Sequence, residues 1–524
     1  MSPVLPELPA GVVARRSLAH LQQVVAVDSS SDETSASIPS TPGQARLAEA
    51  LEAFFKGVGA RVERDDYANV IATLPARNHS GEPLALMVHL DTARGTHNVE
   101  RLSVLEAWDG APIPYANNDA IRVSLENYPS AEAFSGEDIV HGPGDAPFGL
   151  DDKLGLAHLM TLATLLAEHP EIPHPELIIV GRPDEEIGRM AAVEGLAVLL
   201  ASRGVRSGYT IDGIFPFEIN AENFNASQFS VWFAERPLAL TPGRPVAVHL
   251  GGVNTHGATA MAEGHRAGPR LAAELVAAVA SHGDRLVPVD FASDPLRDCD
   301  AVLTFSAADD AAVEALRAAA EAVMAPHLPR GASLSVIPGS PGSPEDTPAP
   351  GGACVDLLAW MRRFMDSDGV SPLMAEDSEG RQGYSHPFRV RRDGGGLRLD
   401  VRLRDFSADG LDAREDHLRA LAGERPFRVN AQYINMGPKL AERADLVERA
   451  VAAGEAVGVR CPVQPIRGGT GVDPFLARGV AVANLGTGYF APESEKEFTS
   501  LQMMERHARW LLAVVQGQGA GERR

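Results

Sequence analysis

The sequence predicts an α/β fold in two parts. Apolar runs that fit buried parallel strands alternate with helical periodicity near both ends of the chain. Between them, strand-like runs alternate apolar and polar residues, which is typical of an antiparallel sheet with one face in water. At 524 residues the chain also exceeds the size that one core supports. We therefore expect residues 1–225 and 437–524 to form a catalytic domain with a mostly parallel mixed sheet flanked by helices, and residues 226–436 to form a smaller inserted α+β lid domain.

The first segment opens with helices and strands in alternation. Helical periodicity covers residues 17–27 and 44–55, and Thr41-Pro42 precedes the second run as a cap and a first-turn proline. The run 84–88 is continuous and apolar, so we expect a buried strand that ends at His89. Further strands are expected at 60–63 and 69–74.

A βαβ unit follows this strand. A helix is predicted at 155–167, and a strand at 176–180 comes after it. Strands joined in this way are parallel neighbours, so their carboxyl ends face one crevice. The chain returns to this pattern with a helix at 446–458 and a strand at 480–485.

The segment after about residue 224 has a different character. Its low-complexity stretch 339–352 is expected to be a flexible surface loop, and no internal repeat is visible in the sequence. The expected strands are 229–233, 246–250, 301–305 and 397–403, and the expected helices are 269–281, 308–324 and 411–421.

Four acidic or histidine motifs stand where buried strands should end. They are His89-Leu-Asp91-Thr92, Gly149-Leu-Asp151-Asp152-Lys153, Pro183-Asp184-Glu185-Glu186-Ile187-Gly188 and Tyr209-Thr-Ile-Asp212-Gly213. Carboxylates and imidazoles gathered at one edge of an open sheet are what a two-metal hydrolase needs. Alone, Glu185-Glu186 could equally be a solvated acidic turn, but the ordered set favours a metal site.

Composition excludes several other classes of protein. The formal net charge of −23 argues against nucleic-acid and anionic-membrane partners, which would be repelled. Cys299, Cys354 and Cys461 show no CxxC spacing, so we expect buried thiols in a reducing compartment. The N-terminal residues lack the basic start and apolar run of a signal peptide, and no stretch reaches membrane-spanning length. A cytoplasmic location is expected.

Taken together, the motifs resemble those of the peptidase T family. The resemblance rests on SASIPSTPGQAR (35–46), VHLDT, GLDDKLG, RPDEEIG, IDGIFPFEINAENFNA (211–226), RGGT (467–470) and the segment 484–500. It covers both catalytic segments, whereas in the lid it is strong only around His256 and Arg404. These relatives are tripeptide aminopeptidases with a zinc-exopeptidase-like catalytic domain, in the dinuclear-zinc family that also holds aminoacylases, carnosine-type dipeptidases and glutamate carboxypeptidases.

The resemblance implies a role for each motif. One metal would be held by His89, Asp151 and Asp212, and the other by Asp151, Glu186 and a ligand from the C-terminal segment. The first Asp of the Asp-Asp-Lys motif is the natural bridge between them. Asp91 is placed to accept the second ring N–H of His89 and fix its tautomer. Glu185 would be the general base that takes a proton from the attacking water. The implied cofactors are two divalent metal ions, zinc first, with manganese or cobalt as alternatives.

Substrate recognition is implied for five further residues. His256 matches a lid histidine that polarises the scissile carbonyl oxygen, although a lone lid histidine is more often a surface residue. Arg404 and Arg467 resemble arginines that clamp a substrate carboxylate, and Arg404 could instead pair with Asp405 or Asp400. The side chains of Glu222 and Asn223 match an acidic patch near the substrate amino group, or could cap the lid hinge.

One ligand position departs from the family pattern. Where the relatives carry a His four residues before the Glu of a Glu-Phe pair, this chain has Glu493. A carboxylate can ligate zinc but is a harder donor, which shifts preference toward manganese or similar ions. The alternatives are an exposed Glu-rich loop in which Glu495 or Glu497 replaces it, or a lost site. The lid is also enlarged between His256 and Arg404, which leaves the substrate class open.

We therefore expect a metallo-exopeptidase that hydrolyses the amide bond of small peptides. The leading function is aminopeptidase action on tripeptide-like substrates. A carboxypeptidase or amidohydrolase acting on N-acyl amino acids or dipeptides is the alternative within the same chemistry, and an inactive peptide-binding homologue is the alternative outside it. The lid is also a candidate surface for homodimer formation.

Overall fold

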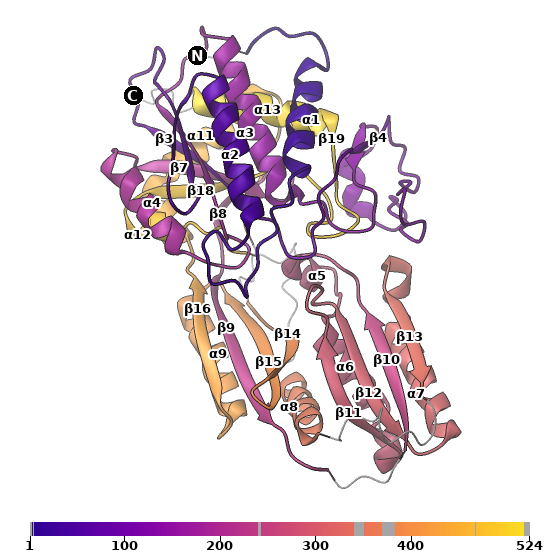
Figure 1. Ribbon diagram of the computed structural model, residues 1–524. Helices are drawn as coiled ribbons and strands as arrows, with labels where there is room; N and C mark the ends of the chain where they lie inside the picture. The colour runs from indigo at the N-terminus through magenta and orange to yellow at the C-terminus, as the bar shows by residue number, and fades with distance from the viewer. Residues whose placement is uncertain are drawn as a thin grey trace. The chain divides into compact units, whose positions relative to one another are not determined.

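The computed structural model of the chain describes residues 3, 5–238, 243–339, 351–368, 383–466 and 468–517. They form two compact units, Met1–Asn223 with Ile434–Arg524, and Phe224–Tyr433 (Figure 1). The expected surface loop 339–352 lies almost entirely outside the described residues. No helix within the described ranges is long and apolar enough to cross a membrane.

The first unit is built on an eight-stranded mixed sheet. In spatial order its strands are β1 (Arg61–Arg64), β2 (Val70–Leu74), β6 (Leu177–Arg182), β3 (Leu84–His89), β7 (Ser207–Gly213), β18 (Ala481–Gly486), β8 (Ile219–Glu222) and β17 (Val463–Pro465). The central strands β6, β3, β7 and β18 are parallel neighbours, and antiparallel pairs flank them on both sides. The predicted parallel pairing of the strands that precede His89 and Glu185 is confirmed, with His89 opposite Arg182.

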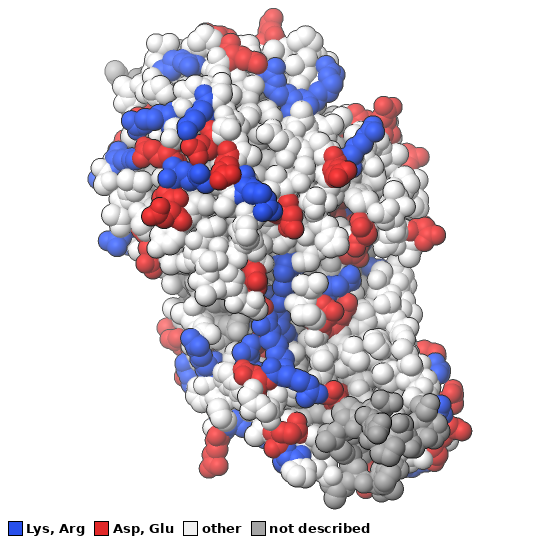
Figure 2. All heavy atoms as spheres, viewed as in Figure 1, with Lys and Arg blue, Asp and Glu red and all other residues white. Residues whose placement is uncertain are grey.

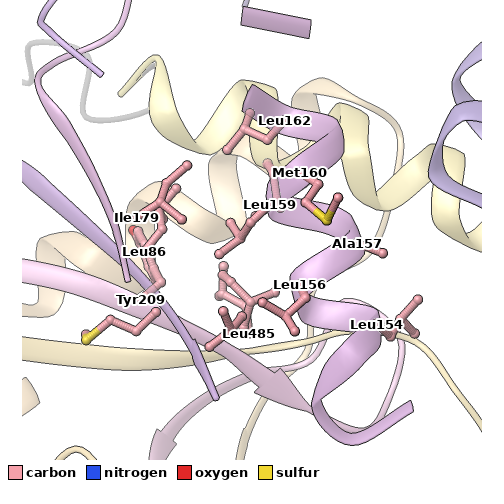
Figure 3. Close-up of a cluster of buried hydrophobic side chains, with 14 of the residues drawn as sticks. Leu86, Leu154, Leu156, Ala157, Leu159, Met160, Leu162, Ile179, Tyr209 and Leu485 are labelled. Carbon is pink, nitrogen blue, oxygen red and sulfur yellow. The ribbon is translucent and has the colours of Figure 1, made fainter. Parts of the chain in front are cut away.

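Helices cover this sheet and form its core with it. The central helix α3 (Leu150–Glu168) is buried along almost its whole length, and α1 (Val12–Val25) and α13 (Leu501–Val515) pack against it. Figure 3 shows apolar side chains of α3, such as Leu159, beside Leu86 and Ile179 of the strands. The remaining helices are α2 (Pro42–Gly57), α4 (Ala191–Ser202), α10 (Gly437–Leu440), α11 (Ala444–Ala456) and α12 (Asp473–Ala477).

Helix α2 begins as predicted but is capped differently. Thr41 is the N-cap residue and Pro42 lies in the first turn. The Thr41 hydroxyl, however, makes no capping bond, because it donates to the carbonyl of Ser30 at 2.8 Å. Thr41 is therefore the N-cap residue, as predicted, but its hydroxyl ties the helix start to the preceding loop instead of bonding a backbone N–H of the helix.

A small sheet that was not predicted joins the two segments of the first unit. Its strands are β19 (Phe498–Ser500), β5 (Ile139–His141) and β4 (Ser103–Leu105), each too short for periodicity to reveal. The hydroxyl of Tyr115 also donates to the carbonyl of Lys496 at 2.9 Å. These contacts hold the loop before β19 beside the segment that leads into α3.

The second unit contains two four-stranded antiparallel sheets. One has the order β14 (Tyr384–Asp393), β15 (Gly396–Asp405), β9 (Asn225–Ala234) and β16 (Phe427–Tyr433). The other has the order β11 (Leu286–Ser293), β12 (Asp300–Ala307), β10 (Arg244–Gly251) and β13 (Ser333–Pro338). The helices packed on them are α6 (Gly268–Ala278), α7 (Asp310–Met324), α8 (Gly352–Asp368) and α9 (Ala408–Ala422), and a short α5 (Gly257–Ala262) precedes α6. One continuous apolar core runs through both sheets. Antiparallel sheets with helices packed on them confirm the α+β prediction.

Charged side chains are interspersed on the face of the molecule in Figure 2, with basic ones gathered over β14 and β15. These arginines have acidic partners: Arg398 lies 3.0 Å from Asp400, and Arg402 lies 3.1 Å from Asp298. Such pairing makes this a mixed surface rather than a purely cationic one.

Candidate metal centre and catalytic site

The four motifs meet at the carboxyl edge of the central strands of the first unit. His89 ends β3, Asp212 lies near the end of β7, and Asp151 opens α3. Glu185 and Glu186 follow β6, the parallel neighbour of β3. The C-terminal loop that carries Glu493 follows β18, the next strand beyond β7. Parallel pairing therefore gathers these residues although they are far apart in the sequence.

A first group of metal-ligating atoms contains His89, Asp151 and Asp212, whose ligand atoms all lie within 4.8 Å of one another. The Nε2 atom of His89 is 2.9 Å from Oδ1 of Asp151 and 3.4 Å from Oδ1 of Asp212. One imidazole nitrogen and two carboxylates form a donor set that suits zinc and similar divalent ions.

A second group contains Asp151, Glu186 and Glu493, again with all ligand atoms within 4.8 Å of one another. Asp151 belongs to both groups, as a bridging ligand must. Among the described residues, Oε1 of Glu186 is buried without a hydrogen-bond partner. A buried carboxylate oxygen left in this way costs free energy unless a cation or donor meets it.

The hydrogen bonding of His89 directs its Nε2 atom toward the two carboxylates of the first group. Nδ1 lies 2.9 Å from the backbone carbonyl of Asp91 and 3.5 Å from the carboxylate of the same residue. The Nδ1–H therefore donates mainly to a main-chain oxygen, which corrects the expectation that the Asp91 carboxylate is the principal acceptor. In the Nδ1–H tautomer that a bound cation would require, the Nε2 lone pair faces the space between the two carboxylates.

The carboxylate of Asp91 has another task. Its Oδ1 accepts the backbone N–H of Glu185 at 2.9 Å, and its Oδ2 accepts that of Glu186 at 3.0 Å. The preceding residue, Asp184, has a φ of 56°, a left-handed conformation that costs free energy for a residue other than glycine. Asp184 is held there by Gln44, whose side-chain amide donates to its carboxylate at 2.7 Å. The turn that carries the two glutamates is thus anchored on both sides.

Glu497 organises the C-terminal loop. Its Oε1 accepts the backbone N–H of Glu493 at 2.8 Å, and its Oε2 accepts those of Phe148 and Gly149 at 3.0 Å each. Glu493 itself has a φ of 53°, so its position depends on such support. Glu497 is buried and Glu495 lies 3.9 Å from the ammonium of Lys496, whereas Glu493 lies among the ligand groups. Of the three glutamates weighed from the sequence, the structure brings Glu493 to the centre.

The electrostatics fit bound cations. Burial and the nearby carboxylates of Glu493 and Asp151 raise the pKa of Glu186 well above its ordinary value. Burial also raises the pKa of Asp212, and it raises that of Glu185 to about 7 although Arg182 opposes the shift. Carboxylates brought together in this way repel one another as anions. Two divalent cations would neutralise them, so the donor set and its charge fit a dinuclear centre.

Two residues beside the centre were not predicted from the sequence. The hydroxyl of Tyr489 lies 3.1 Å from Oδ2 of Asp151. Arg182 is fully buried, donates to the carbonyl of Thr470 at 2.7 Å and lies 4.0 Å from Glu185. The sequence did contain a signal for Arg182, because this arginine ends an otherwise apolar strand. A charge that is buried in this way usually has a polar or charged partner.

The predicted substrate residues are distributed over both units. In the first unit, Glu222 accepts the side-chain amide of Asn435 at 3.1 Å, and Asn223 accepts the backbone N–H of Met436 at 2.6 Å. Both side chains therefore hold residues 435–436, where the chain re-enters the first unit, beside the end of β8. These contacts fit the alternative that the two residues cap the lid hinge. Their contact with a substrate stays a prediction.

Arg404 and His256 lie in the second unit. Arg404 is buried, donates to the side chain of Gln432 at 2.8 Å and stacks over the ring of Tyr433. The aspartates weighed as its partners pair elsewhere, Asp400 with Arg398 and Asp405 with Arg414. His256 directly precedes α5, and Arg467 lies outside the described residues. Their roles stay predictions.

The chain is similar in sequence to named proteins along almost its whole length. The chain is 24% identical over 510 residues to a protein named Peptidase T from Macrococcus caseolyticus, covering 95% of this chain and 97% of that protein. It is 25% identical over 504 residues to Peptidase T from Halothermothrix orenii, covering 94% and 96%. The shared length covers both units.

Solved structures show the same fold. A tripeptidase from Staphylococcus aureus superimposes with a TM-score of 0.54 at 13% sequence identity, over 96% of this chain and 98% of that one. The aminopeptidase PepT from Bacillus cereus superimposes with a TM-score of 0.51 at 16% identity, over the same shares. At such identities the likeness concerns the fold.

A model of one protein family matches the larger part of the chain. The match spans residues 128–517, which hold the Asp-Asp-Lys motif, the paired glutamates and the C-terminal loop. These are the parts that converge in the structure, together with His89 from the segment before them. The chain thus belongs to Peptidase family M20/M25/M40 and is a hydrolase of the metallopeptidase class.

Proposed function

We propose that the chain is an aminopeptidase that releases the N-terminal residue of tripeptide-like substrates. The observation that carries this proposal is the position of Asp151, whose carboxylate belongs to both groups of ligand atoms. A two-metal hydrolase needs a carboxylate that can ligate both ions, whereas an ordinary acidic cluster does not. The substrate class is supported by the Peptidase T relatives, which align with more than nine tenths of the chain.

Two divalent cations would be held by these side chains. His89, Asp151 and Asp212 would hold one, and Asp151, Glu186 and Glu493 the other. When bound, such ions polarise a carbonyl oxygen and lower the pKa of water. We propose zinc at the first site, where an imidazole is available, and leave manganese or cobalt as alternatives at the all-carboxylate second site.

Glu185 is proposed as the general base. It follows the anchored residue Asp184 and precedes the ligand Glu186, and both glutamate N–H groups are fixed by Asp91. Adjacent side chains on such a turn point in different directions, so one can ligate while the other faces the attacking water. The buried guanidinium of Arg182, 4.0 Å away, stabilises the carboxylate form that accepts the proton.

Substrate contacts are proposed for residues of both units. His256 would donate to the carbonyl oxygen as negative charge develops there, and Arg404 and Arg467 would bind the substrate carboxylate. Glu222 is the candidate for the amino group, with Asn223 beside it.

The sharpest test is whether the protein removes the N-terminal or the C-terminal residue of a peptide. We would compare a free tripeptide with the same peptide acetylated at its N-terminus, with zinc, manganese or cobalt added. An aminopeptidase cleaves only the free peptide and releases its first residue. Cleavage of the acetylated peptide, or release of the C-terminal residue, would point instead to the carboxypeptidase or amidohydrolase alternative. Failure to bind metal would favour the inactive peptide-binding alternative.

We also propose a cytoplasmic location. The support is that Cys299, Cys354 and Cys461 are all buried and free, as is usual in a reducing compartment. Cell fractionation with an antibody to the chain tests this proposal directly.

A further inference from the structure

The loop between β18 and β19 brings two side chains to the candidate metal centre. Glu493 is one of them, and Tyr489, four residues earlier, is the other. Tyr489 is buried, and its hydroxyl lies 3.1 Å from Oδ2 of Asp151. Asp151 is the carboxylate that both groups of ligand atoms share. Tyr489 therefore contacts the one side chain on which both candidate metal sites depend.

The tyrosine is the donor in this hydrogen bond. An ionised carboxylate only accepts hydrogen bonds, whereas a phenol, with its usual pKa of about 10, keeps its proton at neutral pH. A hydrogen bond from a neutral donor to an anion is also stronger than one between two neutral groups. The hydroxyl of Tyr489 can thus stabilise the negative charge of Asp151 without adding a charge of its own.

The backbone holds Tyr489 in place from both sides. The N–H groups of Gly488 and Tyr489 both donate to the carbonyl of Ile214, at 3.2 Å each. Gly488 has a φ of 90°, which glycine adopts without strain. The next residue, Phe490, forms a β-bridge with Phe498, and its N–H donates to the Phe498 carbonyl at 2.8 Å. The fold therefore fixes the position of the hydroxyl at the centre.

The contact concerns the oxygen of Asp151 that serves the second group. Oδ1 lies 2.9 Å from Nε2 of His89, which belongs to the first group. Tyr489 contacts the other oxygen, Oδ2. A carboxylate that bridges two cations offers one oxygen to each, so Oδ2 is the oxygen that would act together with Glu186 and Glu493. Tyr489 is thus placed to influence the second site.

The second group carries more negative charge than the first. Both contain Asp151, but the first adds one carboxylate and an imidazole that is neutral when it ligates, whereas the second adds Glu186 and Glu493. Glu493 stands where the family pattern has a His, so it brings one charge more than that pattern would. Three carboxylates within 4.8 Å of one another repel each other. A neutral donor at Asp151 lowers this repulsion.

We propose that Tyr489 is a positioning residue for the second metal ion and acts as a pair with Glu493. By donating to Oδ2, the hydroxyl fixes the direction of the Asp151 carboxylate and offsets part of the charge that Glu493 adds. The centre can then use a carboxylate at a position suited to an imidazole. If an imidazole replaces Glu493, one negative charge is gone and the hydroxyl should matter much less. This inference rests on the dinuclear centre of the proposed function, but not on which peptide is cleaved.

A double-mutant cycle on metal affinity tests the pair. The four chains are the wild type, Tyr489→Phe, Glu493→His and Tyr489→Phe/Glu493→His, each of full length and freed of metal. Tyr489→Phe keeps the ring and removes only the hydroxyl, so the chain should still fold. Zinc is titrated in competition with a chelating dye, which gives the affinities of the tighter and the weaker equivalent.

The cycle has a definite expected result. Where Glu493 is present, Tyr489→Phe should weaken the weaker equivalent by roughly 10–100-fold, as is usual when the partner of a metal ligand is removed. In the Glu493→His background the same change should cost less than about threefold, so the two substitutions are not additive. The same loss in both backgrounds, an equal loss at both equivalents, or no loss at all would overturn the proposal.

Tyr209→Phe is the matched control. It removes another buried hydroxyl of the first unit, which donates to the carbonyl of Leu446 at 2.7 Å. Like Tyr489→Phe, it should lower the free energy of unfolding, but it should leave both zinc affinities unchanged. A matching loss of zinc affinity in Tyr209→Phe would show that the loss of any buried hydroxyl disturbs the centre, and the specific role of Tyr489 would fall.

Turnover separates this inference from the proposed function. If the wild-type chain binds two zinc ions but cleaves no peptide, the aminopeptidase proposal fails, while the double-mutant cycle still decides the role of Tyr489. If the wild-type chain binds fewer than two ions, the pair formed by Tyr489 and Glu493 is overturned together with the dinuclear centre.

Discussion

The side chain of Glu497 holds the backbone of Glu493 in place, with a hydrogen bond of 2.8 Å from the Glu493 N–H to Oε1. Its other carboxylate oxygen accepts the N–H groups of Phe148 and Gly149, three and two residues before Asp151. One buried carboxylate therefore joins the loops that carry two ligands of the second candidate site. The position of Glu493 depends on this connection because its own φ of 53° is unfavourable.

Glu497→Gln should loosen this connection. The amide group presents only one acceptor oxygen, so N–H groups that the carboxylate now satisfies lose their partner in a buried place. We expect a loss of about 2–4 kcal/mol in the free energy of unfolding. Metal affinity at the second site should fall more than at the first. Urea unfolding and metal titration measure the two effects, with Glu495→Gln as the control. Equal weakening of both sites would contradict the specific role given to Glu497.

Asp151→Asn should remove the bridge. The amide keeps the shape but lacks the negative charge that two cations share, so we expect loss of at least one bound metal and of nearly all activity. Metal content by mass spectrometry and turnover of a tripeptide check this. Full metal content with wild-type turnover would refute the dinuclear centre.

Glu185→Gln should affect turnover and spare metal binding. The amide cannot accept the proton, so the rate constant should fall by roughly 100-fold or more. Metal occupancy should match that of the wild-type chain. If occupancy fell instead, the roles of Glu185 and Glu186 would have to be exchanged.

Glu493→Ala should weaken one metal selectively. Only the group formed with Asp151 and Glu186 loses a donor, so activity should drop and excess metal should partly restore it. Glu493→His should keep activity and move the preference toward zinc, because a borderline nitrogen replaces a hard oxygen. Isothermal titration with zinc and manganese separates these results. Unchanged metal stoichiometry and kinetics in Glu493→Ala would show that Glu493 is not a ligand.

Acid should destabilise the first unit through two stacked histidines. The rings of His158 and His507 lie 3.8 Å apart, and burial lowers the pKa of His158 to about 4 and that of His507 well below its ordinary value. The unfolded chain then binds more protons than the folded chain as pH falls from about 6.5 toward 4, so stability is lost over that range. For His158 alone the loss approaches about 3 kcal/mol. Urea unfolding from pH 7 to 4 measures it.

The control for this prediction is His158→Gln. It removes one titrating ring from the stack, so the dependence of the unfolding free energy on pH should become weaker between pH 6.5 and 4. An unchanged slope in this variant would show that other groups cause the acid sensitivity.

The sequence by itself determined the α/β pattern, the parallel strands before His89 and Glu185, and the family. These follow from local information, because apolar periodicity sets the elements and their order places each motif at a strand end. The sequence motifs also singled out the five side chains that form the two ligand groups sharing Asp151.

Only the tertiary structure decided how those residues are supported. The carboxylate of Asp91 binds two N–H groups that lie more than 90 residues away, and Glu497 reaches segments nearly 350 residues away. No local pattern encodes such contacts, since they depend on how strands pair.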